Sequence, residues 1–233
     1  MKRFFKTAQA AATGGAYHVL LDDKPIKTPC GAAFALPTQA LAQAVAAEWQ
    51  ACGEVIKPAD LLLTQLSNTA LDRTAAALAD LRKTICAYGE TDLLCYRADR
   101  PNSLVEAQSH HWDPPLKWLR AQRGISLTTT TAFMGHRQPE GTLAKLDALI
   151  APYDAFSLTA LHQVTALTGS LVLAAAFAQN AIDPQAVWAA ATVDERYQSE
   201  RWGEDKEAKA TLEKKRLEFL AAVSFWTNLS TTI

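Results

Sequence analysis

Short stretches of alternating apolar and polar residues mark the first forty positions of the chain. The segment AYHVLLDDKPIKTP alternates on both sides of the pair Asp22-Asp23, and the following CGAAFALP is a second short extended piece that contains Gly31 and Pro37. Alternation with a period of two is typical of half-buried strands, and Asp, Gly and Pro favour turns. The pattern therefore predicts a small β-rich unit built from hairpins.

A helical pattern begins directly after the residues LPT. Its apolar positions recur at spacings of four, four and three, which places them on one side of a helix. They are Leu41, Val45, Trp49 and Cys52. Gly53 is placed to end this helix, whose apolar side is expected to cover one face of the hairpins.

Beyond residue 62 the apolar positions keep a helical period over most of the remaining chain. One such face runs through Leu66, Ala70, Thr74, Ala77, Leu81, Ile85 and Tyr88. Gly89 then follows as a residue suited to terminate a helix. The spacing predicts a helical region that begins near residue 63.

A second helical stretch follows Pro101. Ser103 and Glu106 have the spacing of a capping box, which predicts a helix from that point to Gly124. The pair at residues 114–115 is expected to kink or restart this helix, because proline lacks the backbone N–H that a helix interior needs.

The polar stretch SLTTTTAFMGHRQPEG shows no clear period and predicts a loop or a short extended segment. Four further helices are expected after it, over residues 142–151, 158–179, 184–202 and 205–229. Asp183 can cap the third of them, and Pro184 suits a first helical position.

These elements together predict an α+β fold. A small N-terminal β-rich α/β domain is expected over residues 1–62, followed by a larger all-α helical domain over residues 63–233. Hydrophobic residues make up 49% of the 233 residues, so the chain is long and apolar enough to bury a substantial core.

Charge and cysteine usage narrow the classes of partner and compartment. The formal charge of -1 gives no overall field that would draw the chain to nucleic acid or to an anionic membrane. The apolar window SLVLAAAFA is too short to span a bilayer.

Cys30, Cys52, Cys86 and Cys95 form no C-x-x-C pair, and the basic start MKRFFKT is not followed by the apolar run of a secretory signal. Reduced thiols and a cytoplasmic location are expected.

The segment TDLLCYRADRP and the later HWDPPLKW hold the residues that could carry chemistry. Cys95 lies in an apolar run without a glycine elbow, and adjacent helical residues such as His110 and His111 point in directions about 100° apart. A buried structural thiol is favoured, and a small hydrolase that uses Cys95 with His110 or His111 is the alternative. His110 and Asp113 alone are too few ligands for zinc, and an N-cap role accounts for Asp113. No phosphate loop is present, so no catalytic, metal or cofactor site is expected.

Tryptophan content and one charged segment favour a protein-binding role. The tryptophans are Trp49, Trp112, Trp118, Trp188, Trp202 and Trp226. Such residues fill cores, but Trp and Arg are also frequent anchors of protein interfaces. The segment TVDERYQSERWGEDKEAKATLEKKRLEF is unusually charged. Both a solvated helix face and a charged docking surface fit this pattern.

Seven short segments occur in the order found in one known family. They are RFFK, VLLDDKPIKTP, LPTQALAQAVAAEW, LTQLSNTALD, YGETDLLCYRADRP, QSHHWDPPLKW and DERYQSERWGEDKE. The chain therefore resembles the assembly chaperones that bind the free α subunit of the F-type ATP synthase catalytic head, the second F-one assembly factor of mitochondria. The resemblance covers nearly the whole chain and implies a non-enzymatic protein with a small N-terminal α/β domain and a helical C-terminal domain. Phe5 departs mildly from the family, in which Trp or Tyr is commoner there.

The resemblance also implies that an acidic residue at the start of DERYQ matters for activity, and Asp194 is the matching position. We expect the partner surface on the charged C-terminal portion, with Arg97 and Trp112 as supports near the join between the domains. The expected contact residues are Asp194, Glu195, Glu200, Arg201, Trp202 and Glu204. The α subunit is the expected partner, and neither nucleic acid, membrane insertion, a small-molecule substrate nor a cofactor is expected. Because the chain starts almost at the first family motif, it resembles a bacterial, cytoplasmic relative of proteins found in the mitochondrial matrix.

Overall fold

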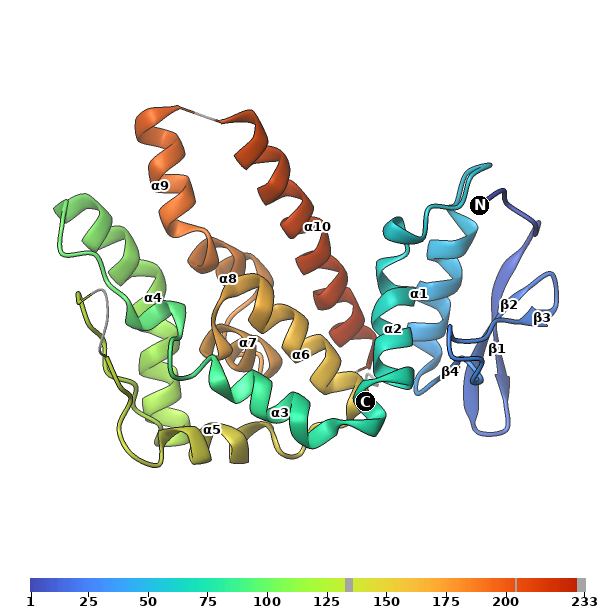
Figure 1. Ribbon diagram of the computed structural model, residues 1–233, viewed down its shortest axis with the longest axis horizontal. Coiled ribbons are helices and arrows are strands. Elements are labelled where there is room, and N and C mark those ends of the chain that lie inside the picture. The colour runs from blue at the N-terminus through green and yellow to red at the C-terminus, as the bar shows by residue number, and fades with distance from the viewer. Residues whose placement is uncertain (133–135, 204, 230–233) are drawn as a thin grey trace. The chain divides into compact units, whose positions relative to one another are not determined.

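An antiparallel sheet opens the chain in the computed structural model, which describes residues 1–132, 136–203 and 205–229 (Figure 1). Its strands are β1 (Ala8–Thr13), β2 (Ala16–Leu21), β3 (Lys24–Pro25) and β4 (Ala35–Leu36). Strand β2 pairs with each of the other three, in a register that places Ala8 opposite Leu21 and Tyr17 opposite Leu36. The alternation that predicted hairpins therefore reflects a sheet centred on β2.

The turn between β2 and β3 is formed by the two aspartates. Asp22 has φ 46° and Asp23 has φ 67°, a left-handed conformation that aspartate tolerates better than most residues. The Asp22 carboxylate accepts hydrogen bonds from the backbone N–H groups of Thr7 and Lys6, at 2.9 Å each. These bonds lower the pKa of Asp22, because they stabilise the ionised form. The predicted Asp-Asp turn is confirmed.

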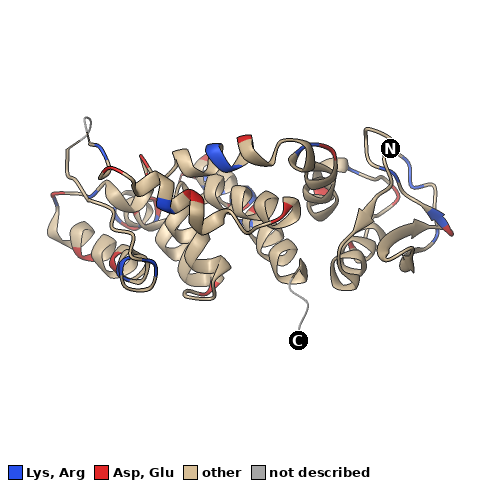
Figure 2. Cartoon of the chain, turned by 90° about the horizontal axis from the view of Figure 1, so that it is seen from below, with Lys and Arg blue, Asp and Glu red and all other residues tan. Residues whose placement is uncertain are grey.

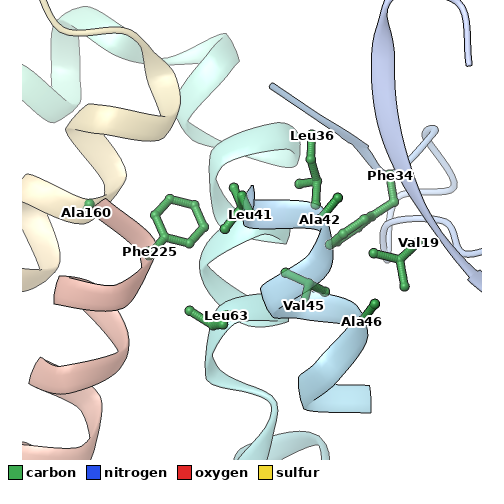
Figure 3. Close-up of a cluster of buried hydrophobic side chains, with 10 residues drawn as sticks. All are labelled: Val19, Phe34, Leu36, Leu41, Ala42, Val45, Ala46, Leu63, Ala160 and Phe225. Carbon is green, nitrogen blue, oxygen red and sulfur yellow. The ribbon is translucent and has the colours of Figure 1, made fainter. Parts of the chain in front are cut away.

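Helix α1 (Gln39–Gln50) packs against β1 and β2. The hydroxyl of Thr38 caps it by accepting from the backbone N–H of Leu41 at 3.2 Å. The side chains that form this core are Val19, Phe34, Leu36, Leu41, Ala42, Val45, Ala46, Leu63, Ala160 and Phe225 (Figure 3). The last two come from helices α6 and α10, so segments distant in sequence complete the core of the sheet unit.

Helices and short 3₁₀ turns make up most of the chain after α1, as Figure 1 shows. Their bounds are η1 (Pro58–Asp60), α2 (Leu62–Asp72), η2 (Thr74–Ala76), α3 (Leu78–Ala87), η3 (Leu93–Cys95), α4 (Asn102–Arg123), α5 (Thr142–Ile150), α6 (Ala155–Thr168), α7 (Leu171–Ala178), α8 (Pro184–Ala191), α9 (Val193–Trp202) and α10 (Lys206–Leu229). None of the helices in the described ranges is both long and apolar enough to cross a membrane. The predicted α+β fold, with a small sheet followed by a helical region, is confirmed.

Two compact units emerge from the contacts within the chain. The first contains Met1–Leu78, Tyr153–Ala160 and the chain from Leu220 onward, and the second contains Ala79–Pro152 and Leu161–Phe219. Each unit therefore draws on more than one stretch of sequence. The predicted division into domains at residues 1–62 and 63–233 stays a prediction.

A buried aspartate explains why the helix expected over residues 158–179 is two helices. The break lies at Gly169, which has φ +69°, and Ser170, whose hydroxyl accepts from the backbone N–H of Leu173 at 3.0 Å. Asp92 adds a second cap to α7, since its carboxylate accepts from the N–H of Val172 at 3.1 Å, and it also caps η3 by accepting from the N–H of Leu94 at 3.1 Å. Burial raises the pKa of Asp92 to about 6, against the opposing effect of these hydrogen bonds. The cap comes from a residue about eighty positions away, which the local pattern could not reveal.

Helix α4 begins and continues differently from the prediction. The capping box is wrong, because Ser103 lies inside the helix and its hydroxyl pairs with the Tyr197 hydroxyl at 2.7 Å. Pro114 and Pro115 lie within the helix, which does not restart at them, although each removes one backbone donor. The predicted end is confirmed by Gly124, which is left-handed with φ 62°.

Candidate docking site

The residues expected to contact a partner lie on different sides of helix α9. Glu195, Gln198, Ser199 and Trp202 follow spacings of three, one and three, so they share one face of the helix. This face borders a groove shared with the first turns of α10. Asp194, Tyr197 and Arg201 instead follow the α4 side of the helix, as their hydrogen bonds show.

The groove between α9 and α10 is the most exposed part of this site. Its volume is about 310 Å³, and it is lined by Glu195, Gln198, Ser199, Trp202, Gly203, Asp205, Ala208, Lys209 and Leu212. Trp202 is 75% exposed, although tryptophan is a residue that normally buries most of its surface. Glu195, Asp205, Lys209 and Leu212 line the groove together with Trp202. The groove thus combines one large aromatic anchor with mixed charge.

Two backbone features hold Trp202 at the rim of this groove. Gly203 has φ +89°, which few other residues adopt, and it ends α9 directly after the tryptophan. Asp205 begins the next helix by accepting from the N–H groups of Glu207 at 2.7 Å and Ala208 at 3.0 Å. These bonds lower the pKa of Asp205, so it stays ionised beside the groove.

Asp194 has an internal role on the other side of α9. Its Oδ1 accepts from the Gln108 side-chain amide at 2.8 Å, and the Gln108 carbonyl accepts from the backbone N–H of Ala98 at 2.8 Å. Gln108 is only 3% exposed, so the chain of bonds runs through the interior of the second unit. Asp194 therefore fixes the position of α9 on α4.

Tyr197 and Arg201 add a second contact at the α4 side. The Arg201 guanidinium donates to the Tyr197 hydroxyl at 2.6 Å and lies 5.6 Å from the centre of its ring. The same hydroxyl pairs with Ser103, as described above. Arg201 is exposed, so it can also meet a partner while remaining tied to α9.

Arg97 and Trp112 support this arrangement from within α4 and the segment before it. The Trp112 side chain is 1% exposed, and its indole N–H donates at 2.7 Å to the carbonyl of Ala190, which lies in α8 three residues before α9 begins. Arg97 lies over the Trp112 ring at 5.2 Å and pairs with Asp113 at 3.0 Å. The contacts described for both residues lie within the second unit, so their predicted place near a join between domains stays a prediction.

Most of the residues that the sequence predicted to contact a partner lie on helix α9. Asp194, Glu195, Arg201 and Trp202 lie on α9, Glu200 lies on the same helix with its side chain exposed, and Glu204 falls outside the described residues. Sequence reasoning missed Gln108, which joins α9 to α4. It also missed Gln198 and Leu212, although the spacing of the former from Trp202 could have placed it on the groove face.

Cys95 has the surroundings of a structural thiol. It is fully buried, and burial, followed by the negative charge of Asp92, raises its pKa to about 12. The side chain of Gln138 is its hydrogen-bond neighbour. The His110 and His111 rings contact each other edge to face at 4.9 Å, and Arg196 lies 3.3 Å from His111. Among the described residues, Gln138 and Arg97 lower the pKa of Cys95, but burial and Asp92 outweigh them, so these surroundings favour the thiol over the reactive thiolate.

Native alkylation tests the hydrolase alternative directly. Iodoacetamide is expected to modify exposed Cys30 in the folded protein and to leave Cys95 unmodified, because a buried thiol with a raised pKa holds almost no thiolate. Cys30 is the internal control, although a hydrogen bond to Asp72 raises its pKa as well. Peptide mass mapping before and after unfolding in urea measures both sites, and fast native labelling of Cys95 would favour the hydrolase.

Asp113 does not have the N-cap role predicted for it, because it lies inside α4. Its carboxylate pairs with Arg97 at 3.0 Å and with Lys117 at 3.8 Å. Among the residues that the structure describes, no group of His, Cys, Asp and Glu side chains is arranged to hold a metal ion. The carboxylate of Asp113 therefore serves to position Arg97.

Comparison with known proteins gives consistent matches along the chain. A family model described as ATP12 chaperone protein matches residues 2–120. Protein atp12, mitochondrial, from Schizosaccharomyces pombe is 21% identical over 219 residues, which is 89% of this chain and 75% of that protein. The crystal structure of Atp12 from Paracoccus denitrificans matches with a TM-score of 0.91 and 38% identity over 98% of both chains.

A further crystal structure extends this likeness. It is that of an Agrobacterium tumefaciens protein described as a candidate chaperone, with a TM-score of 0.94 and 34% identity over 98% of this chain and 86% of that one. Both structural matches cover nearly all of the chain, so they include the helices that carry the α9–α10 groove.

Proposed function

The chain belongs to the ATP12 family of chaperones, which act in ATP synthase assembly, and on this basis we propose that it binds the free α subunit of the catalytic head. In this proposal the chain prevents the α subunit from aggregating and then releases it to the β subunit. The partner is a protein, and no nucleic acid, small-molecule substrate, cofactor or membrane insertion takes part. We place this function in the bacterial cytoplasm, and that of organelle relatives in the mitochondrial matrix.

The observation that carries the proposal is the exposed Trp202 beside the α9–α10 groove. A subunit of a ring exposes faces that are meant for its neighbours, and large exposed apolar patches promote self-association. An exposed tryptophan can anchor on such a face, and the charged residues around it can form the polar rim typical of a reversible interface.

Release in this proposal is an exchange of partners. The β subunit presents the surface that the α face has evolved to meet, so it competes successfully with a chaperone that is held by one anchor and a charged rim. Such an exchange requires no nucleotide hydrolysis by the chaperone. The partner-contact residues remain Asp194, Glu195, Glu200, Arg201, Trp202 and Glu204, with the exposed ones expected to make direct contact and Asp194 to hold α9 in place.

Light scattering by the isolated α subunit tests the function. A molar excess of the chain is expected to suppress the rise in scattering as the α subunit is diluted into native buffer, whereas an equal mass of serum albumin is not. Subsequent addition of β subunit is expected to return the chaperone to its free elution position in size-exclusion chromatography. Scattering that rises equally with and without the chain would contradict the proposed function and favour the alternative that the chain is a scaffold for other proteins.

A further inference from the structure

A second groove lies in the first unit, far in sequence from the α9–α10 groove. Its volume is about 520 Å³. The residues that line it are Phe4, Phe5, Leu21, Asp22, Lys24, Pro25, Ile26, Lys27, Thr28, Pro29, Trp49, Thr64 and Asn68. The N-terminal segment, the β2–β3 hairpin with the residues after it, α1 and α2 thus each supply part of one apolar channel.

The aromatic wall of this groove has one exposed ring, Phe4, which packs on rings that are buried or half-buried behind it. Phe4 is 63% exposed and meets Phe5 edge to face at 5.5 Å, and Phe5 meets Trp49 in the same way at 5.8 Å. The Trp49 indole donates to the Thr64 hydroxyl at 3.0 Å, and that hydroxyl donates to Glu48 at 2.7 Å. These bonds hold the wall in place, so a ligand would meet a preformed surface.

One polar atom in this groove has no partner. The side-chain oxygen of Asn68 is buried and accepts no hydrogen bond from any residue that the structure describes. Buried polar atoms are normally hydrogen-bonded, and each exception needs an explanation. Asn68 lines the groove with its oxygen covered, so a ligand donor would satisfy this atom only after the side-chain amide rotates toward the groove.

The charged side chains that line the groove indicate what kind of ligand it binds. Within the described ranges, neither Lys24 nor Lys27 forms an ion pair, and both line the groove. Asp22, the acidic residue of the lining, already accepts from the backbone at Lys6 and Thr7. Figure 2 shows blue positions on the N-terminal segment and at β3, whose first residue is Lys24. Asp22 stays ionised, but two lysines against one carboxylate leave an excess of positive charge in the lining, which favours a negatively charged ligand.

We propose that this groove binds an extended, acidic segment of the client protein. Apolar side chains of the segment pack on the exposed Phe4 ring, carboxylates approach Lys24 and Lys27, and a backbone N–H donates to Asn68 once its amide has rotated toward the groove. The inference deepens the proposed function and rests on it in one respect, namely that the client is a protein. The segment is a second point of attachment, separate from the α9–α10 groove, and two attachment points would strengthen binding by raising the effective concentration.

A labelled peptide tests the groove without any ATP synthase subunit. The probe is the fluorescein-labelled peptide DFDLDFD, and its basic counterpart KFKLKFK is the negative control. Fluorescence anisotropy is expected to show saturable binding of the acidic peptide by the full chain and no binding of the basic one. Equal binding of the two peptides, or none of the acidic peptide, would overturn the inference.

Charge reversal locates the binding. The double variant Lys24→Glu/Lys27→Glu is expected to weaken binding of DFDLDFD about tenfold, because it places two carboxylates beside an acidic ligand. The matched control Lys214→Glu/Lys215→Glu makes the same change in net charge on exposed residues of α10 and is expected to bind like the unaltered chain. Equal loss in both variants would show a nonspecific charge effect and contradict the groove.

Asn68→Ala separates a binding role from a structural one. Removing an unpartnered buried oxygen is expected to leave the melting temperature unchanged or higher, while the affinity for DFDLDFD falls about fivefold. Unchanged affinity would remove Asn68 from the site. If the peptide binds as expected but the chain does not protect the α subunit from aggregation, the proposed function is contradicted and the peptide-binding groove is supported. If the chain protects the α subunit but does not bind the peptide, the proposed function is supported and the groove is contradicted.

Discussion

Trp202→Ala is expected to weaken binding of the free α subunit by about 2–4 kcal/mol, the range of an interface hot spot, which is roughly 30- to 700-fold in affinity. The reason is that Trp202 is 75% exposed and lines the α9–α10 groove, so its removal takes an anchor from the surface and little from the core. The circular dichroism spectrum and the melting temperature should therefore stay close to those of the unaltered chain.

Leu217→Ala is the matched control for this prediction. Leu217 is also a large apolar residue, 53% exposed, and it lies on α10 five positions beyond Leu212, which turns it to a different side of the helix from the groove. Titration of labelled α subunit against both variants measures the effect. Similar affinities for Trp202→Ala and the unaltered chain would move the docking surface away from the groove.

Asp194 requires a different pair of variants, because its contact with Gln108 is internal. Asp194→Asn keeps an oxygen that can accept from the Gln108 amide, whereas Asp194→Lys removes that acceptor and places a charged donor opposite the neutral N–H donor of Gln108. We therefore expect Asp194→Lys to lose protection of the α subunit through displacement of α9, and Asp194→Asn to keep most of it. Equal loss in both would mean that the charge itself contacts the partner.

Much of the fold was readable because its signals are local. The Asp22-Asp23 turn, the left-handed Gly124 and the Asp183 cap before Pro184 each follow from the properties of one or two residues, and the structure contains all three. The α+β class followed from the change between a period of two and a helical period.

The differences arise where a distant residue decides the outcome. Asp92 caps α7 from another part of the sequence, so a continuous apolar run became two helices. Ser103 matches a capping box in the sequence, yet its hydroxyl pairs with Tyr197 of α9. At Ser103 a tertiary hydrogen bond takes the place of the local one that the pattern suggested, and at α7 the bond from Asp92 adds to the local cap of Ser170.

The candidate site likewise combines features that the sequence predicts with features that depend on distant residues. The position of α9 and the charge of its surroundings could be predicted, but periodicity cannot tell an exposed tryptophan from a buried one. Trp112 and Trp202 both lie in helical segments, and one is 1% exposed while the other is 75% exposed. The Asn68 oxygen and the groove it lines depend on four separate segments of the first unit, which no single motif reveals.

Trp112→Ala is expected to give the largest loss of stability, about 3–5 kcal/mol in the free energy of unfolding. The indole is almost fully buried, and its removal leaves a cavity beneath Arg97 and an unpaired carbonyl at Ala190. A loss of that size is a large part of the stability of an ordinary domain. Urea unfolding followed by circular dichroism measures it, provided that the slope with denaturant is unchanged.

Trp112→Phe separates packing from the hydrogen bond. It keeps an aromatic face for Arg97 but loses the donor to Ala190, so a smaller loss of about 1–3 kcal/mol is expected. Because Ala190 lies three residues before α9, native-state hydrogen exchange of the α9 amides should rise in both variants, more in Trp112→Ala. Unchanged protection of α9 in Trp112→Ala would mean that this tryptophan stabilises the second unit without positioning the docking helix, and the support assigned to it here would then pass to Gln108 and Asp194 alone.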